Sequence, residues 1–378
     1  MNIKINKEKN NPLLDAYDNN DLDKFRSLIA DGANVNCIDT MGNSLISAVV
    51  RNPDTGDNRE FFNILMENNT HLDPIGKSPN LLYIAVFYKR IFFFDELLKR
   101  GINIDKRNIK NILDVAREPI IFEIMKTQEY HFLDSILNKK IDVEIYNNNH
   151  DTVINNFIRT YKGSITKEQK LDVLHRFVNL GANINERGQN GLQPIHCIAR
   201  IKSNYFFDEI FDKNLNIDLN SRDMHGNTAL IYAVKFDNFT GAKKLIENGA
   251  AVNIYNSKNQ SAFFLSIITG NEKIFNLLLK NNVVISTIDK NKCNILHHII
   301  EHEFQKNTKE KIQKNNKLFK YCQKIIDKHP ELLFAKNNNN ESPINLMEKN
   351  KTNTYMTNFF NQAVKNIKLS KNNDGNNI

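Results

Sequence analysis

Related segments recur along this chain at a fixed spacing, and no other feature of the sequence constrains the fold as strongly. Thr228, Ser261 and Asn294 occupy the same place in three consecutive segments, and Asn11 and Ser44 have the same spacing, since each number exceeds the previous one by 33. A fixed period of about 20–50 residues is typical of stacked repeats, each of which buries its apolar surface only against its neighbours. The period therefore predicts a repeat architecture, although a length of 378 residues would otherwise suggest two or three globular domains.

Each repeat contains the signals for two helices. A short polar residue suited to capping a helix precedes one apolar run, and a second apolar run follows after a short turn. The predicted caps are Asn11, Ser44, Thr152, Thr228, Ser261, Asn294 and Ser342, two of them followed by proline. The second helices are predicted to end at residues that tolerate positive φ, namely Gly32, Asn69, Gly101, Gly181, Asn214, Gly249 and Asn282. Lys140 and His329 stand where glycine is expected, so those turns are predicted to be strained or built differently.

A helix, turn, helix and β-turn at this period resembles the ankyrin repeat, whose signature is T-P-L-H-x-A. The residues that carry the resemblance are G-N-T-A-L-I-Y-A at 226–233, Q-P-I-H-C-I-A at 193–199, N-I-L-H at 294–297 and S-P-I-N at 342–345. The resemblance implies an all-α solenoid of about ten helix-turn-helix repeats joined by β-turn loops. It covers residues 12–366, between polar tails at 1–11 and 367–378. Irregular insertions are expected near 52–58, 161–169 and 303–316, and the repeat at 108–147 is long enough to hold an additional helix.

One short motif points to a different function. His298, Glu301 and His302 form H-x-x-E-H, which on a helix resembles an inverted zinc-peptidase motif and suggests a zinc-dependent hydrolase. In the repeat register, however, His297 and His196 fall on the histidine of the signature, and the resemblance implies that this side chain supports the turn through hydrogen bonds. A zinc peptidase also needs a third ligand, and the residues after His302 look like repeat and tail. The structural interpretation is favoured, so neither an enzyme nor a metal or cofactor is predicted.

Composition narrows the remaining choices. The net charge of +8 comes from lysines spread along the chain, and Cys37, Cys197, Cys293 and Cys322 stand singly, as reduced buried residues do. No apolar segment approaches the roughly 20 residues that span a bilayer, and the N-terminus lacks the apolar core of a secretory signal. We expect a cytoplasmic monomer. The Asn, Lys and Ile-rich composition also suggests a bacterial effector that is secreted into a host cell without a signal peptide.

The leading functional hypothesis is a scaffold that binds a protein partner on its concave face. In ankyrin repeats the turn tip and the last residues of the first helix vary with the partner. In this sequence those positions are Phe87, Tyr88, Arg159, Arg200, Met224, His225, Lys235, Phe236, Glu301 and His302. Asn36, Asn185 and Asn253 match asparagines that eukaryotic hydroxylases modify in ankyrin proteins, and the alternative is that they are unmodified turn residues. The identity of the partner does not follow from these residues.

A basic segment at 306–324 supports a different class of function, the binding of RNA or an acidic lipid surface. Lys306, Lys309, Lys314, Lys317, Lys320 and Lys324 would share one broad arc of a helix, largely away from its apolar residues. The alternative is an ordinary second helix with a solvated lysine face. The second interpretation is favoured, and nucleic acid is an unlikely partner on this basis.

Overall fold

The computed structural model describes residues 11–72, 80–104, 118–160, 165–212, 215–286, 288–289, 291–305, 316–349 and 354–374. The chain divides into two compact units, an N-terminal unit of residues 1–194 and a C-terminal unit of residues 195–378. Each unit is a stack of helix pairs.

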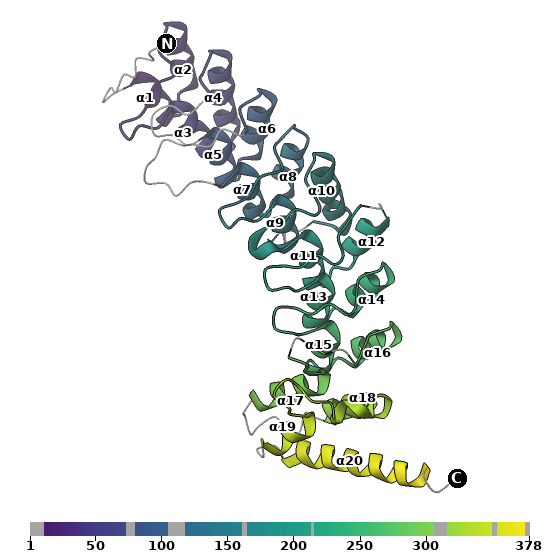
Figure 1. Cartoon of the computed structure of the whole chain (residues 1–378). Helices are drawn as coiled ribbons and strands as arrows, with labels where there is room; N and C mark the ends of the chain where they lie inside the picture. Colours follow the sequence, from purple (N-terminus) through teal and green to yellow (C-terminus); the bar gives the residue numbers. More distant parts are fainter. Residues whose placement is uncertain are drawn as a thin grey trace. The chain divides into compact units, whose positions relative to one another are not determined.

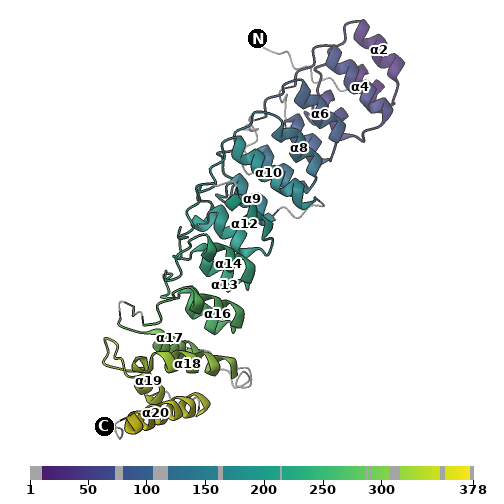
Figure 2. The ribbon, with the colours of Figure 1, turned by 90° about the vertical axis from the view of Figure 1, so that its right-hand side faces the viewer.

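In the N-terminal unit, first and second helices alternate along the chain. They are α1 (Pro12–Asp18), α2 (Leu22–Ala30), α3 (Leu45–Arg51), α4 (Gly56–Glu67), α5 (Leu81–Phe87), α6 (Ile91–Lys99), α7 (Ile120–Thr127), α8 (Tyr130–Leu137), α9 (Val153–Thr160) and α10 (Lys167–Asn179), followed by the 3₁₀ turn η1 (Gln189–Gly191). The first helices α3, α5, α7 and α9 contact one another in that order, and α6, α8 and α10 form part of a second row behind them (Figures 1 and 2).

The C-terminal unit repeats this arrangement. Its helices are α11 (Pro194–Arg200), which starts at the unit boundary, α12 (Tyr205–Asp212), α13 (Ala229–Lys235), α14 (Phe239–Glu247), α15 (Ala262–Ile268), α16 (Glu272–Lys280), α17 (Ile295–Gln305), α18 (Asn316–Lys328), the 3₁₀ turn η3 (Pro330–Leu333), α19 (Pro343–Lys349) and α20 (Thr354–Asp374). The first helices α13, α15, α17 and α19 are in successive contact, and α14 packs on α16. Within the described ranges the regular elements are helical, with isolated β-bridges at the turns, as at Tyr255 and Ser261.

All seven predicted caps are confirmed. Each cap side chain accepts a backbone N–H from two or three residues further on, at donor–acceptor distances of 3.0–3.3 Å. The predicted glycine stops have φ between +71° and +103°, while Asn69 and Asn282 have φ of +54° and +57°. Asn214 lies outside the described residues. His329 has φ of −137° and precedes η3, so that turn is built differently, without a left-handed residue.

Aromatic rings pack against one another between consecutive helix pairs. In the N-terminal unit, Phe61 meets Tyr17 and Phe25 edge-on at centroid distances of 5.1 and 4.9 Å. In the C-terminal unit, Phe275 packs against Tyr321 at 4.4 Å. These rings therefore hold neighbouring repeats together in both units.

The irregular segments are described only in part. Residues 52–55 form a loop and α4 begins at Gly56, where buried Asn58 binds Tyr17, Val49 and Pro53 through its side chain. Residues 161–164, 306–315 and 105–117 lie outside the described residues, so the expected insertions there and the additional helix near 108 stay predictions. Helix α20 continues past the predicted boundary at 366 as far as Asp374, because no glycine or proline interrupts it.

Candidate partner-binding surface

An Asp or Asn at the base of the turn tip builds the loop that precedes the first helices α3, α9, α13, α15, α17 and α19. Asp39, Asn147, Asp223, Asn256, Asp289 and Asn337 each accept the backbone N–H of the residue four positions on through a side-chain oxygen, at 2.7–3.0 Å. Five of these residues also accept the backbone N–H two positions on, which is an Asx turn, and the two bonds together close the loop. Sequence reasoning missed these residues, although each stands five positions before a predicted cap.

In the C-terminal unit the structure brings several predicted partner residues together. The Arg200 guanidinium lies 5.6 Å from the ring centroid of Tyr232 and 5.2 Å from that of Phe236, and the two rings stack on each other. Phe236 is 38% exposed, at the C-terminal end of α13, and Lys235 beside it is exposed. Arg200 ends the preceding first helix α11, so residues of two repeats form one cation–π cluster.

The same cluster is tied to a turn tip. The Tyr232 hydroxyl donates to Asp223 Oδ2 at 2.6 Å, and Asp223 Oδ1 accepts the backbone N–H groups of His225 and Asn227. Burial raises the pKa of Asp223, but the hydrogen bonds from Tyr232 and Asn227 outweigh it and hold that pKa below its usual value. Met224 at the tip is 74% exposed. The tip and the helix end are therefore held as one surface.

In the N-terminal unit the exposed rings Phe87 and Tyr88 occupy the equivalent helix end. Phe87 is 79% exposed and Tyr88 39%, and their ring centroids are 5.0 Å apart in an edge-on arrangement. Neither ring is part of the core, so both present apolar surface to the solvent. Met41, at a turn tip, is 68% exposed and was missed by sequence reasoning.

Arg159 has a different environment from the other predicted residues. Its guanidinium pairs with Asp151 Oδ2 at 2.7 Å and with Gln189 Oε1 at 3.2 Å, inside the N-terminal unit. Burial raises the pKa of the Asp151 carboxyl, and Arg159 opposes that effect. A guanidinium that neutralises a buried carboxylate is engaged in the fold. Its role in partner binding stays a prediction.

Comparison with known proteins also finds ankyrin repeats in this chain. Residues 164–256 match the family described as ankyrin repeats in three copies. The chain is also 24% identical over 229 residues to ankyrin repeat protein L371 of Acanthamoeba polyphaga mimivirus. The chain therefore contains ankyrin repeats. The predicted fold class, an all-α ankyrin-repeat solenoid, is confirmed.

The match to the mimivirus protein covers 58% of this chain, and it spans only 28% of the length of that relative. Among solved structures, the ankyrin repeat domain of Bcl-3 is 17% identical with a TM-score of 0.45, covering 72% of this chain and 94% of that one. The ankyrin repeat domain of human ASB11 is 17% identical with a TM-score of 0.44, covering 58% of this chain and 91% of that one.

The signature histidines of these ankyrin repeats have the predicted structural task. His297 is fully buried; its Nδ1 lies 2.9 Å from Asn294 Oδ1 and its Nε2 lies 3.0 Å from the Glu341 carbonyl oxygen. His196 Nε2 likewise lies 3.0 Å from the Ser221 carbonyl oxygen. Burial lowers the pKa of His297. Both side chains therefore connect a first helix to a later turn.

The H-x-x-E-H residues lie on α17, as predicted. His298 is mostly buried, with Nε2 3.4 Å from Asp289 Oδ2 and Nδ1 4.0 Å from Glu301 Oε2, whereas the His302 side chain lies outside the described residues. In the part of the chain that the structure describes, no three His, Cys, Asp or Glu side chains are arranged to hold a metal ion. All four cysteines are free and buried, as expected.

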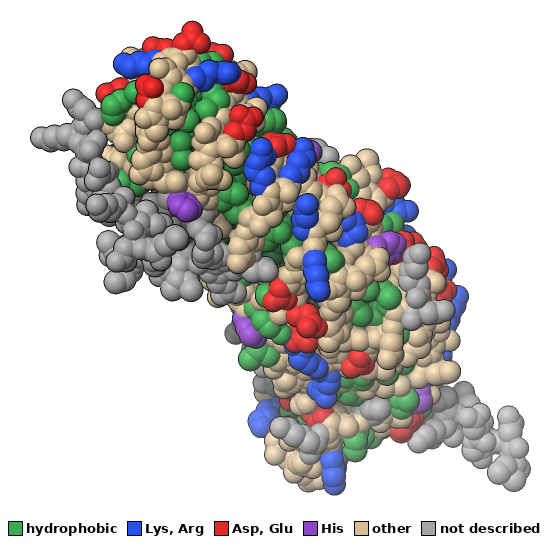
Figure 3. Space-filling model, turned by 90° about the horizontal axis from the view of Figure 1, so that it is seen from above, with side chains coloured by type: hydrophobic (Ala, Val, Ile, Leu, Met, Phe, Trp, Pro, Cys, Tyr) green, Lys and Arg blue, Asp and Glu red, His purple; other side chains and the backbone are tan. Residues whose placement is uncertain are grey.

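The basic segment resembles an ordinary second helix wherever it is described. Lys320 Nζ lies 3.3 Å from Glu272 Oε1, and Lys324 Nζ lies 3.3 Å from Asn276 Oδ1, both on the neighbouring α16. Lys306, Lys309 and Lys314 lie outside the described residues, as does the Lys317 side chain. Figure 3, which views the molecule from above, shows acidic and basic side chains interspersed over the described residues of the face that it presents.

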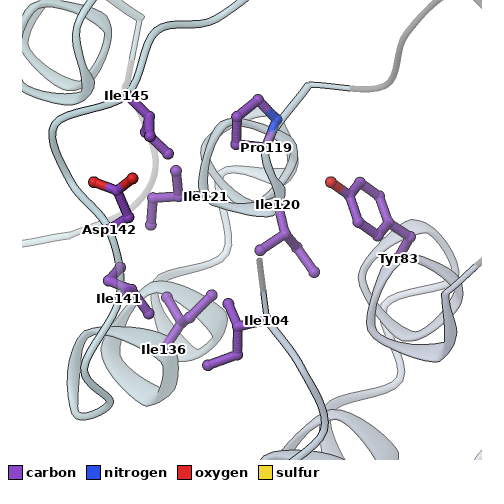
Figure 4. A pocket seen from close by; sticks show the side chains of 9 residues that line it. All are labelled: Tyr83, Ile104, Pro119, Ile120, Ile121, Ile136, Ile141, Asp142 and Ile145. Carbon is purple, nitrogen blue, oxygen red and sulfur yellow. The ribbon is translucent and has the colours of Figure 1, made fainter. Parts of the chain in front are cut away.

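A small apolar pocket lies inside the N-terminal unit. It has a volume of about 160 Å³ and is lined by Tyr83, Asp142, Pro119 and several isoleucines of α7, α8 and the loop after α8 (Figure 4). The Tyr83 hydroxyl donates to the Glu118 carbonyl oxygen at 2.6 Å. With one carboxylate among apolar walls, the pocket lacks the paired acid and base that catalysis needs.

The three candidate hydroxylation sites lie at the repeat junctions. Asn36 Oδ1 accepts the His71 N–H at 2.8 Å and Asn253 Oδ1 accepts the Val284 N–H at 3.0 Å, so each joins its repeat to the next. The Asn185 N–H donates to Asn183 Oδ1 at 2.9 Å. Asn220 makes an equivalent bond to the Ala251 N–H and was missed by sequence reasoning.

In the described residues, no helix is long and apolar enough to cross a bilayer.

Proposed function

We propose that this ankyrin-repeat chain is a scaffold that binds a protein partner on the surface formed by its turn tips and the ends of its first helices. Ankyrin repeats generally mediate protein–protein interactions. The observation that supports the proposal is the position of the exposed large apolar side chains. Among the exposed large apolar side chains of the described residues, half lie at turn tips or first-helix ends, namely Met41, Phe87, Tyr88, Met224 and Phe236, and the others are Ile91, Val284, Ile288, Phe334 and Leu369. Exposed apolar residues that gather at equivalent places mark interaction sites, and aromatic residues and arginine are enriched in binding hot spots.

Site-specific photocrosslinking tests this proposal. A photoreactive phenylalanine analogue placed at Phe236 should capture a defined protein from candidate host or source-cell lysates, and the same analogue at exposed Lys243 of α14 should not. Capture from position 243 without capture from position 236 would place the partner on the second helices and contradict the proposed surface.

A pair of substitutions then measures how much the C-terminal unit contributes to the free energy of partner binding. Replacing Lys235 and Phe236 by alanine should weaken binding of the captured protein by about 2 kcal/mol or more. The loss of one ring from the Arg200 cluster should reduce stability by only about 1 kcal/mol. Lys243→Ala is the matched control and should change neither quantity. Normal binding by a stable double variant would show that the partner binds elsewhere.

A secreted bacterial effector role is a finer hypothesis, which rests on composition, whereas the relative named above is viral. It predicts that the full chain, fused to a reporter, is translocated by a bacterium with a dedicated secretion system. Retention inside the bacterium contradicts it.

Hydroxylation is a further hypothesis that applies only inside a eukaryotic cell. Coexpression with an asparaginyl hydroxylase should add about one oxygen to the intact mass at Asn36, Asn185 or exposed Asn253, and an unchanged mass would exclude these sites.

A further inference from the structure

A hollow of about 610 Å³ opens in the N-terminal unit, where the C-terminal ends of α3, α5 and α7 lie next to one another. Its volume lies within the range of about 300–1,000 Å³ that is typical of ligand sites. The lining combines the apolar side chains of Ile84, Val86, Phe87, Tyr88 and Tyr83 with charged residues at the edges. The hollow therefore offers both apolar surface and charge to whatever enters it.

The apolar part of the hollow lacks a cover within the described residues. Phe87 projects from the end of α5 with 79% of its surface exposed, and Tyr88 next to it supports the ring edge-on. Ile84 and Val86 of the same helix are buried and form part of the lining. A large apolar side chain placed against Phe87 would remove this ring from water, and that removal is the main source of binding free energy at such sites.

The charges around the hollow are balanced except on the α3 side. Lys126 Nζ on α7 lies 2.9 Å from Glu118 Oε2 and 3.1 Å from Glu123 Oε1. Lys89 Nζ lies 2.7 Å from Glu129 Oε1. These two lysines are already neutralised by neighbouring carboxylates.

Arg51, at the end of α3, differs from these two lysines because no described carboxylate pairs with it. Its guanidinium forms no ion pair within the described residues, and its Nε is buried without a hydrogen-bond partner. An arginine stays charged at any physiological pH, and its planar group is suited to a bidentate pair with a carboxylate. A carboxylate is therefore the group that the hollow is missing, at the edge formed by α3.

We infer that this hollow binds a segment of the partner protein in which a large apolar residue lies within a few positions of an aspartate or glutamate. The apolar side chain packs against Phe87 and Tyr88, and the carboxylate pairs with Arg51. The inference rests on the proposed function, because the hollow lies at the same first-helix ends, and it adds the chemistry of the partner. A peptide is favoured over an anionic surface because, among the described residues that line the hollow, Arg51 is the single unpaired cation beside apolar walls.

Selection from a random dodecapeptide library on phage, with the immobilised full chain as bait, tests the inference. Parallel selections use Arg51→Gln and Phe87→Ala, with Lys89→Gln as the matched control, because Lys89 lines the same hollow but is already paired. Peptides enriched on the wild type and on Lys89→Gln, but on neither of the other variants, should combine a large apolar residue with Asp or Glu. The absence of such peptides overturns the inference.

Fluorescence polarisation of one enriched peptide separates the two contacts. Changing its acidic residue to the amide should weaken binding to the wild type about tenfold or more and should leave binding to Arg51→Gln unchanged. Phe87→Ala should lose both peptides. Equal losses on the wild type and on Arg51→Gln would show that the carboxylate does not pair with Arg51 and would overturn the assignment, provided that both variants melt within a few degrees of the wild type.

Three further outcomes are distinguishable. Sedimentation with phosphatidylserine–phosphatidylcholine vesicles that depends on Arg51 and Phe87, with no enriched peptide, would assign the hollow to an anionic membrane and overturn the peptide inference. Successful photocrosslinking at Phe236 combined with failed peptide selection would overturn this site alone. Peptide binding at the hollow with failed crosslinking at Phe236 would leave this site standing and reject the C-terminal surface.

Discussion

Replacing Tyr232 with phenylalanine tests how strongly the turn tip is fixed to the first helix of its repeat. The Tyr232 hydroxyl donates to Asp223 Oδ2 at 2.6 Å, and both residues are buried, with 8% and 6% of their surface exposed. A hydrogen bond to a charged group contributes about 1.5–3 kcal/mol. Asn227 Nδ2 remains 3.2 Å from the same oxygen, so the carboxylate keeps one partner. We therefore expect a loss of about 2 kcal/mol, near the middle of the range for such bonds.

The loss should be local and measurable. For a cooperative unit of about 150–250 residues, a loss of about 2 kcal/mol lowers the melting temperature by about 4–8 °C. Because repeats unfold with their neighbours and not always with the whole chain, hydrogen exchange of peptides from α13 and α14 should show the change directly. The matched control is Tyr146→Phe. Its hydroxyl donates to Glu186 at 2.7 Å, but both residues are half-exposed, so water can replace the bond and the loss should be below about 1 kcal/mol.

The pH dependence of this loss tests whether it comes from the hydrogen bond to the ionised Asp223 carboxylate. Hydrogen bonds hold the pKa of Asp223 below its usual value despite burial, so its ionised form stabilises the fold above the unfolded pKa, near 4. That contribution is lost as the pH falls through the folded pKa. The difference between wild type and Tyr232→Phe should therefore be constant above about pH 5 and shrink in acid. A difference that stays constant down to about pH 2.5, or a loss below about 0.5 kcal/mol at neutral pH, would refute the reasoning.

Three other predictions follow from single sites. Gly249→Ala should lose about 1–2 kcal/mol in urea unfolding because its φ is +91°, whereas Gly56→Ala, at the first turn of α4, should cost nothing or stabilise. Burial lowers the pKa of His297, so the unfolded chain binds a proton at this side chain more readily than the folded chain does. The free energy of unfolding should therefore fall below about pH 6.5, by up to about 1.4 kcal/mol per pH unit, and His297→Gln should reduce that slope in thermal melts. Arg159→Met should lower the free energy of unfolding by about 2–3 kcal/mol at pH 8, near the low end for a buried pair because the Arg159 side chain is 30% exposed. The loss should be smaller at pH 5, because burial raises the pKa of Asp151 and the carboxyl is then more readily protonated. Equal losses in calorimetry at both pH values would contradict this.

The repeat architecture could be predicted from the sequence because its signals are local. A cap such as Thr228 bonds to a backbone group only three residues away, and a stop such as Gly249 depends on its own φ. Neither needs a distant contact, so residue type and spacing are sufficient. The fixed period then repeats these local signals until the family is recognisable.

The candidate site could be predicted only as positions, because its properties depend on contacts between repeats. The register placed Arg159 and Arg200 at equivalent helix ends, yet Arg159 neutralises a buried carboxylate while Arg200 lies over two rings at the surface. Gln189 and Phe236, which they contact, belong to the following repeat, and no local pattern specifies them. The same holds for Arg51, which no sequence signal selected and whose lack of an ion pair with any described residue is evident only from its surroundings. Sequence alone determined the helices and their order; only the packing of one repeat on the next decided which charges are neutralised and which remain available to a partner.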